Sequence, residues 1–159
     1  MTTQEPKHLF PLKKILVSTD GSENANRAVR AAIQLAKKSD AELLVVNVLA
    51  MTVPRIYTPM APYPSDDDYS RFFKTAEAET QKVVDQAVNE ARNDSVNARG
   101  KVLSTVTSVA ESILDTSDDE KVDLIVVGTR GLGGFRKLLL GSVSSAIVAH
   151  AHCAVLVVR

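Results

Sequence analysis

The chain has 159 residues, 45% of them hydrophobic, and its 19 basic and 19 acidic residues give a formal net charge of zero. The length suits one domain with a sizeable core, and the charge balance argues against a protein that binds nucleic acid or an anionic membrane by bulk attraction. No stretch approaches about 20 continuous apolar residues, so no transmembrane helix is expected. The single cysteine, Cys153, excludes an intrachain disulfide, and a polar N-terminus without a signal-peptide run completes the prediction of a cytoplasmic protein.

Strand and helix patterns alternate along the chain after a predicted flexible tail at residues 1–11, and residues 12–159 form one predicted domain. Short apolar or β-branched runs predict five strands, at 14–19, 42–49, 99–106, 122–127 and 153–158. Helical spacing of apolar residues predicts four helices, at about 22–38, from the acidic run 66–68 to about 91, at 108–117 and at 142–151. Residues 50–68 carry four prolines and predict a long irregular connection.

This alternation predicts an α/β fold, a single open parallel sheet with helices on both faces. The run Glu42–Leu49 is nearly all apolar, which is typical of a strand buried on both faces. The long helix shows one apolar face, and this pattern predicts that its side chains, including Phe72 and Phe73, lie in the core rather than on a base-stacking surface. That face comprises Tyr69, Phe72, Phe73, Ala76, Val83, Val84, Ala87, Val88 and Ala91.

Glycines concentrate after the fourth predicted strand. Four of the seven glycines lie between residues 128 and 134, and nine residues separate Gly131 from Gly141, where a new helical pattern begins with Ser142. Glycine lets backbone N–H groups approach a ligand without an intervening Cβ, and a helix start adds unpaired donors and a positive dipole end. The segment therefore predicts an anion cradle, most readily for the phosphates of a nucleotide. The sequence leaves open whether Arg130 and Arg136 contact the phosphates or face solvent.

Several other chemistries find no support in the sequence. No lysine follows the glycines as in a P-loop, and Arg136 stands where a dinucleotide fingerprint needs its third glycine. No catalytic Ser–His–Asp set or acid–base carboxylate pair can be assembled, so no catalytic residue is predicted. His150 and His152 are two residues apart rather than the three or four that suit a metal pair on a helix, and Asp66–Asp68 read as a solvated helix start, so no metal site is predicted. Cys153 is interpreted as a small core residue.

Three parts of the sequence resemble the universal stress protein family: the run KILVSTDGSENANRAV with Asp20, the glycine spacing that ends at Gly141 and Ser142, and the closing strand AVLVV. The resemblance covers residues 12–159. It implies a Rossmann-like sheet of order 3-2-1-4-5, binding of ATP, with Mg²⁺, and a homodimer that pairs through the last strand, Ala154 to Val158. It also implies a role in stress survival.

The resemblance also implies the positions of an ATP site. Asp20 would meet the ribose, the backbone of Val48 would meet the adenine, and Thr19 beside Asp20 is a further expected ATP-binding residue. The phosphates would lie among Gly128, Arg130, Gly131, Gly141, Ser142, Val143 and Ser144. Where many members have Gly and Pro after the third strand, this chain has Thr107 and Val109, a departure on the adenine side.

Three functions remain open from the sequence. The first is an ATP-binding regulatory or stress-response protein without fast turnover. The second is an enzyme that uses the same site, a slow ATPase, an autophosphorylating protein or an adenylate-transferring relative, with Ser142 and Ser144 as candidate acceptors. The third is a nucleotide-free dimeric adaptor that works through residues 50–68 and the long helix. Adenine nucleotide and a second copy of the chain are the expected partners, and nucleic acid and membrane are not.

Overall fold

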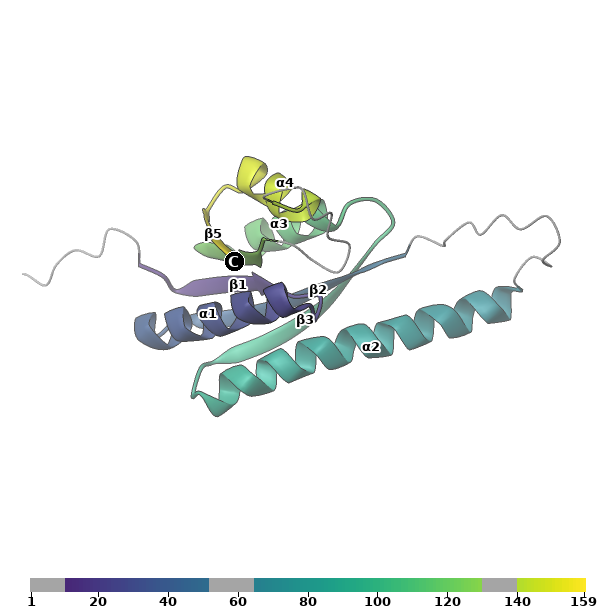
Figure 1. Ribbon diagram of the computed structural model, residues 1–159, viewed down its shortest axis with the longest axis horizontal. Helices are drawn as coiled ribbons and strands as arrows, with labels where there is room; N and C mark the ends of the chain where they lie inside the picture. The colour runs from purple at the N-terminus through teal and green to yellow at the C-terminus, as the bar shows by residue number, and fades with distance from the viewer. Residues whose placement is uncertain (1–10, 52–64, 130–139) are drawn as a thin grey trace, which may run out of the picture.

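Five strands and four helices alternate along the chain in the computed structural model, which describes residues 11–51, 65–129 and 140–159 (Figure 1). The strands are β1 (Lys14–Ser18), β2 (Glu42–Ala50), β3 (Ala98–Thr105), β4 (Leu124–Gly128) and β5 (Ala154–Val158). The helices are α1 (Glu23–Ser39), α2 (Asp66–Asn93), α3 (Val109–Asp119) and α4 (Ser142–His150). Every predicted element is confirmed, with ends that differ from the predicted ones by a few residues. The predicted tail lies outside the described residues except for Pro11.

The strands form one open parallel sheet in the order β3-β2-β1-β4-β5. Val17 of β1 pairs with Val45 of β2 on one side and with Val126 of β4 on the other. The predicted fold class and strand order are therefore confirmed. The chain moves outward in one direction from β1 to β3 and in the other from β4 to β5, so the carboxyl ends of β1 and β4 mark the place where the winding reverses.

The helices cover both faces of the sheet, α1 and α2 on one and α3 and α4 on the other (Figure 1). Successive residues of β1 divide between the faces: Ile15 and Val17 pack with α1 and α2, whereas Leu16 packs with α3 and α4. All three are fully buried. Each such side chain contributes roughly 1.5–3 kcal/mol when it leaves water, so the central strands hold the two layers together.

Helix α2 lies on the sheet with its second half alone. Its buried residues are Val84, Ala87, Val88 and Ala91, and a Cβ at Gly100 of β3 would overlap Cγ1 of Val84. Figure 1 shows the first half of α2 extending past the sheet. The predicted core face is therefore wrong for that half. Phe72 is 53% exposed. Helical spacing identifies the residues on one side of a helix, but it does not show how far the neighbouring sheet extends along that helix.

Strand β5 is an edge strand, and its side chains are half-buried or exposed. Cys153, just before it, is half-buried and packs against the core beneath α3 and α4, which agrees in part with the predicted core position. No helix among the described residues is long and apolar enough to cross a membrane.

An ion-pair network joins the amino ends of three strands to the end of α3. The guanidinium of Arg99 donates to Glu42 at 2.5 Å and to Glu120 at 2.6 Å, and the Lys14 ammonium lies 3.3 Å from Glu120. The paired carboxylates hold the pKa of Arg99 above its usual value, and hydrogen bonds from Arg99 and then Lys14 lower the pKa of Glu120. The network lies at the opposite end of the strands from the site described next.

Candidate functional site

The chain turns sharply at the carboxyl end of β1. Buried Thr19 donates its backbone N–H to the Val46 carbonyl at 2.9 Å, and its Oγ1 accepts the Gly21 N–H at 3.2 Å. The carboxylate of Asp20 accepts the Ser22 N–H at 3.0 Å. Gly21 has φ of +80°, a conformation that glycine adopts without strain. The turn holds the half-buried Asp20 at the carboxyl end of the sheet.

Gly128, the last residue of β4, brings α1 against the neighbouring strand. A Cβ at this position would lie 2.9 Å from the Asn24 carbonyl oxygen and 3.2 Å from the Ala25 nitrogen, both in the first turn of α1. Backbone atoms cannot yield as a flexible side chain can, so the close approach needs glycine. The turn after β1 and the end of β4 therefore lie together, as the sequence predicts from two segments more than a hundred residues apart.

Thr129 fastens the start of α4 to the end of β4. Its N–H donates to the Val158 carbonyl at 2.9 Å, and its carbonyl accepts the Gly141 N–H at 2.7 Å and the Ser144 hydroxyl at 3.1 Å. The end of β4 and the start of α4 are therefore joined directly by main-chain hydrogen bonds. The sequence analysis did not identify Thr129 as a site residue, because it acts through backbone groups that every residue carries.

The amino terminus of α4 differs from those of the other three helices in the described chain. Ser22, Ser65 and Ser108 each cap a helix with the hydroxyl oxygen, whereas α4 begins after Gly141 and has no side-chain cap. The first N–H groups of a helix have no intrahelical acceptor. At α4 these N–H groups belong to its first residues, where the positive end of the helix dipole lies.

The side chains of this first turn have three different environments. Ser142 is exposed, Val143 is half-buried against the core beneath α3 and α4, and Ser144 is 4% exposed. The Ser144 hydroxyl also lies 3.1 Å from the Gly141 carbonyl, so both of its close oxygen neighbours are main-chain acceptors. Ser142 can reach a ligand, and Ser144 holds the turn in place.

The predicted adenine side lies on the same face of the sheet as this turn. Val48 of β2 is half-buried and packs against the same α3–α4 core as Val143 and Val109. Thr107 is exposed, and its N–H donates to the Thr105 hydroxyl at 3.1 Å. The two departures from the family pattern therefore differ in kind, because Val109 packs with the core while Thr107 belongs to the surface turn after β3.

Two of the predicted phosphate contacts, Arg130 and Gly131, lie outside the described residues, as does Arg136. Of the other residues named for the site, Gly128 at the end of β4 lies against the first turn of α1, and Gly141 at the start of α4 is bonded to Thr129. Thr19 and Asp20 follow the neighbouring strand β1, and Val48 belongs to β2 on its other side. In the three described ranges no group of three or more His, Cys, Asp or Glu side chains could hold a metal ion. The arrangement offers hydrogen-bond donors at one end and a carboxylate at the other.

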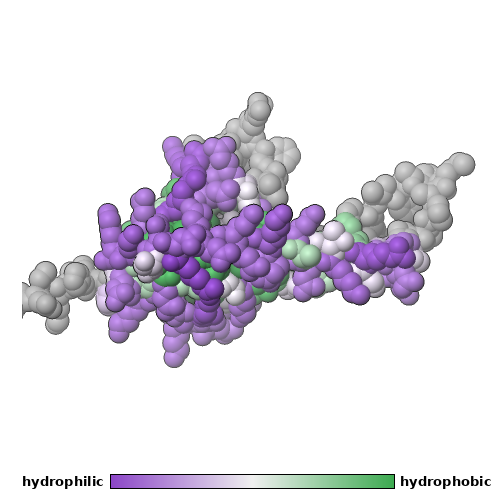
Figure 2. Space-filling view, turned by 90° about the horizontal axis from the view of Figure 1, so that it is seen from below, coloured by the Kyte–Doolittle hydropathy of each residue, from purple (hydrophilic) through white to green (hydrophobic). Residues whose placement is uncertain are grey.

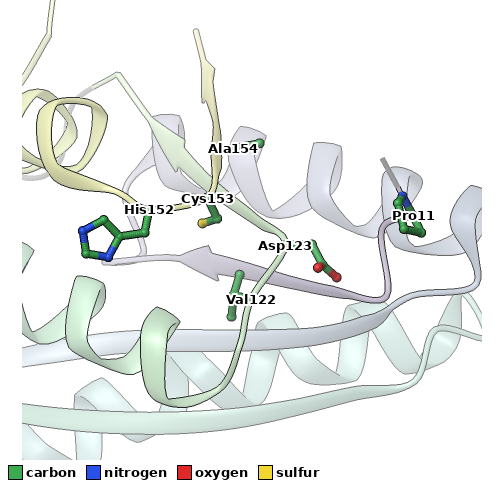
Figure 3. A pocket seen from close by; sticks show the side chains of 6 residues that line it. All are labelled: Pro11, Val122, Asp123, His152, Cys153 and Ala154. Atoms are coloured by element: carbon green, nitrogen blue, oxygen red, sulfur yellow. The ribbon is translucent and has the colours of Figure 1, made fainter. Parts of the chain in front are cut away.

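A recess at the opposite end of the strands has different chemistry (Figure 3). It is lined by Pro11, Val122, Asp123, His152, Cys153 and Ala154. The Asp123 carboxylate accepts the N–H groups of Lys13 and Lys14 at 2.8 and 2.9 Å, and burial raises the pKa of the Cys153 thiol. An occupied carboxylate and a protonated thiol offer little to a phosphate, so the carboxyl end of the sheet remains the candidate site.

The chain belongs to the universal stress protein family, whose model matches residues 11–159. A universal stress protein of Thermus aquaticus is 37% identical over 150 residues, which cover 92% of this chain and 98% of the relative. The structure of UspA from Lactobacillus plantarum superposes with a TM-score of 0.79 at 25% identity, over 93% of this chain and 98% of that one.

Three other structures of the family contain an adenine nucleotide. One is a complex with cAMP, at 24% identity, TM-score 0.67 and coverage of 94% and 98% of the two chains. An Archaeoglobus fulgidus protein holds dAMP, at 21% identity, TM-score 0.64 and coverage of 94% and 99%. An Arabidopsis thaliana protein holds AMP, at 20% identity, TM-score 0.65 and coverage of 92% and 90%. At these identities the likeness establishes the shared fold.

Proposed function

We propose that this protein binds an adenine nucleotide, ATP with Mg²⁺, at the carboxyl ends of β1 and β4, and works as a regulatory stress-response module without fast turnover. The observation that carries the proposal is the uncapped amino terminus of α4, which Thr129 fixes beside the end of β4. Nucleotides in the cAMP, dAMP and AMP complexes of other family members support the ligand class.

The hydrogen-bond donors and the carboxylate lie at opposite ends of the proposed site, and this arrangement orients the nucleotide. Phosphates need donors, and these are the first N–H groups of α4 and the exposed Ser142 hydroxyl. The Asp20 carboxylate repels phosphate but accepts hydrogen bonds from ribose hydroxyls, so the sugar lies at the β1 end. The base then lies toward Val48 on β2. Arg130 and Gly131 complete the phosphate side in this proposal.

ATP is preferred over AMP because each additional phosphate can meet further backbone donors. A helix-end dipole contributes only about 0.3–1 kcal/mol per charge at the surface, whereas a dissociation constant near 1 μM requires about −8.2 kcal/mol. Several donors must therefore act together. Mg²⁺ would enter with the ATP phosphates and needs no dedicated protein cage.

Binding of ATP, ADP, AMP and cAMP to wild type, Asp20→Asn and Asp20→Ala tests the proposal. Asparagine keeps an oxygen for the Ser22 N–H and removes the charge, so it separates ribose binding from the turn geometry. A charged hydrogen bond contributes about 1.5–3 kcal/mol, so we expect at least a tenfold loss for every ribonucleotide in both variants. No detectable binding of any of the four to wild type would refute the nucleotide site.

The enzymatic alternative uses the same site, and the exposure of its serines favours one of them as the phosphate acceptor. Ser142 is exposed at the start of α4, whereas the Ser144 hydroxyl is buried against main-chain oxygens. If the protein phosphorylates itself here, Ser142 is the acceptor. Mass spectrometry after incubation with Mg-ATP distinguishes the two functions, because the regulatory module stays unmodified and an autophosphorylating one gains phosphate that Ser142→Ala removes.

A homodimer through β5 and a cytoplasmic location complete the proposed function. The edge strand presents the apolar Leu156, 36% exposed, and an uncovered apolar edge favours pairing with a second edge. The free thiol of Cys153 fits a reducing compartment.

A further inference from the structure

Helix α2 reaches the turn that carries Asp20 with the side chain of Val83. A Cβ at Gly21 would lie 3.2 Å from Cγ2 and 3.5 Å from Cγ1 of this half-buried valine. Burial along α2 begins at the next residue, since Val84 is fully buried and none of the residues 66–82 is. Figures 1 and 2 show the first half of α2 outside the body, with mostly hydrophilic atoms on its surface in Figure 2. The turn with Asp20 therefore lies where α2 meets the rest of the molecule.

The direction of the Val83 side chain separates it from the hydrophobic core. The sheet-facing side of α2 is formed by Val84, Ala87, Val88 and Ala91, all of which belong to the core beneath α1 and α2. At 3.6 residues per turn, Val83 lies roughly a quarter turn around the helix from the centre of that side. Val83 is not a member of this core. Its γ carbons therefore pack on the turn after β1 and not on the sheet.

Gly21 is the conformationally free point of this turn. Its φ of +80° lies in the left-handed region, and without a Cβ its backbone can adopt many other conformations. Hydrogen bonds within the turn connect its neighbours, because the Gly21 N–H donates to Thr19 Oγ1 and the Ser22 N–H donates to the Asp20 carboxylate. Val83 occupies the space beside Gly21 that a side chain there would fill. Its γ carbons therefore limit the conformations that are open to Asp20.

We propose that Val83 is a positioning residue of the nucleotide site: its packing on Gly21 holds the Asp20 carboxylate in the orientation that accepts hydrogen bonds from the ribose hydroxyls. This role rests on the proposed function, which assigns Asp20 to the sugar. Val83 acts through the turn and not by contact with the ligand. An acceptor that is held in place before binding loses less conformational freedom when the ligand arrives. The position of α2 on the body therefore sets the affinity for the ribose.

Amide hydrogen exchange of Ser22, measured by NMR without nucleotide, tests the positioning step alone, because this N–H donates to the Asp20 carboxylate. We expect Val83→Ala to speed the exchange about fivefold, since the turn opens more often without the γ carbons. Val83→Ile keeps both γ carbons and should exchange as wild type does. The matched control Val88→Ala makes the same change on the sheet-facing side of α2 and should leave Ser22 unaffected. Unchanged exchange in Val83→Ala, or an equal rise in Val88→Ala, overturns the positioning role.

A double-mutant cycle with Asp20→Asn connects this position to binding. In calorimetric titrations we expect Val83→Ala to weaken Mg-ATP binding about fivefold in the otherwise wild-type chain. In the Asp20→Asn background the same change should weaken binding less than about twofold, because the charged acceptor that Val83 positions is already gone. Val83→Ile should bind as wild type does. Val88→Ala should do so as well, with circular dichroism showing that the variant is folded.

The outcomes of the cycle separate this role from the proposed function. A wild-type chain that binds no Mg-ATP refutes the nucleotide site and, with it, the part of Val83 in that site. If wild type binds, then unchanged affinity in Val83→Ala, or an equal loss from this change in both backgrounds, overturns the positioning role alone. A loss of the same size in Val88→Ala would show that Val83 acts through the general stability of α2, and this result also overturns the positioning role.

Discussion

Single glycines control how closely the helices of this protein approach its sheet. Gly128 admits the first turn of α1, and Gly100 admits Val84 of α2. The sequence analysis assigned Gly128 to phosphate binding because it belongs to the glycine cluster. The structure adds a packing role, which no motif predicts because the obstructing atoms, those of Asn24 and Ala25, come from an element about a hundred residues away.

Gly100→Ala should destabilise the fold because the new Cβ overlaps Cγ1 of a buried valine. Overpacking of this kind costs about 1–3 kcal/mol. Urea denaturation followed by circular dichroism measures the loss, and Lys101→Ala, at the exposed neighbouring position, serves as the control. Equal midpoints for Gly100→Ala and wild type would show that α2 moves aside freely.

The serines at 142 and 144 should respond differently to alanine. Ser144→Ala removes a buried hydrogen bond to the Thr129 carbonyl and should lower the free energy of unfolding by about 1 kcal/mol. It should also weaken nucleotide binding, because the start of α4 is less firmly held. Ser142→Ala changes an exposed side chain and should affect binding alone. Thermal melts with and without Mg-ATP separate the effects, and equal stability losses in the two variants would contradict these roles.

At the scale of elements, hydrophobic spacing predicted every strand and helix, and the alternation of strands with helices predicted the layered sheet. The β2 run from Leu43 to Val46 is fully buried, as a continuous apolar run suggested. The pattern failed at the first half of α2, where Tyr69 and Phe72 continue the helical stripe past the edge of the sheet. The spacing of residues within a helix carries no information about the length of its neighbours.

The ion-pair network predicts that the free energy of unfolding depends on pH. Because its partners lower the pKa of Glu120 from the usual 4.5, their stabilising effect is complete above that value and is lost as the pH falls through the folded-state pKa. Glu120→Gln should therefore cost roughly 1 kcal/mol at pH 7 and progressively less in acid below pH 4.5. Urea titrations of both proteins from pH 7 to pH 3 measure the difference, and a difference that grows in acid would refute this account.

At the scale of the whole molecule, the sequence predicted that the ends of β1 and β4 would meet, and they do. It did not predict the backbone anchor at Thr129 or the contrast between α4 and the three serine-capped helices, which depend on backbone geometry.

The edge strand β5 carries the proposed dimer. Leu156→Lys should place a charge on the paired edge and shift sedimentation to smaller species, with Glu90→Lys on α2 as the control. An unchanged size would exclude pairing through β5.

The central claim is that nucleotide phosphates rest on the uncapped amino terminus of α4, and calorimetric titration of Mg-ATP into wild type and Ser142→Asp tests it most directly. An aspartate at the first position of a helix interacts favourably with the dipole, so the fold should be as stable as wild type or more so. It also puts a negative charge where the phosphates lie. We expect the affinity for Mg-ATP to fall at least tenfold, while Gln86→Glu, which adds the same charge on α2, binds as wild type does. A stable Ser142→Asp protein with unchanged affinity for Mg-ATP would contradict the account.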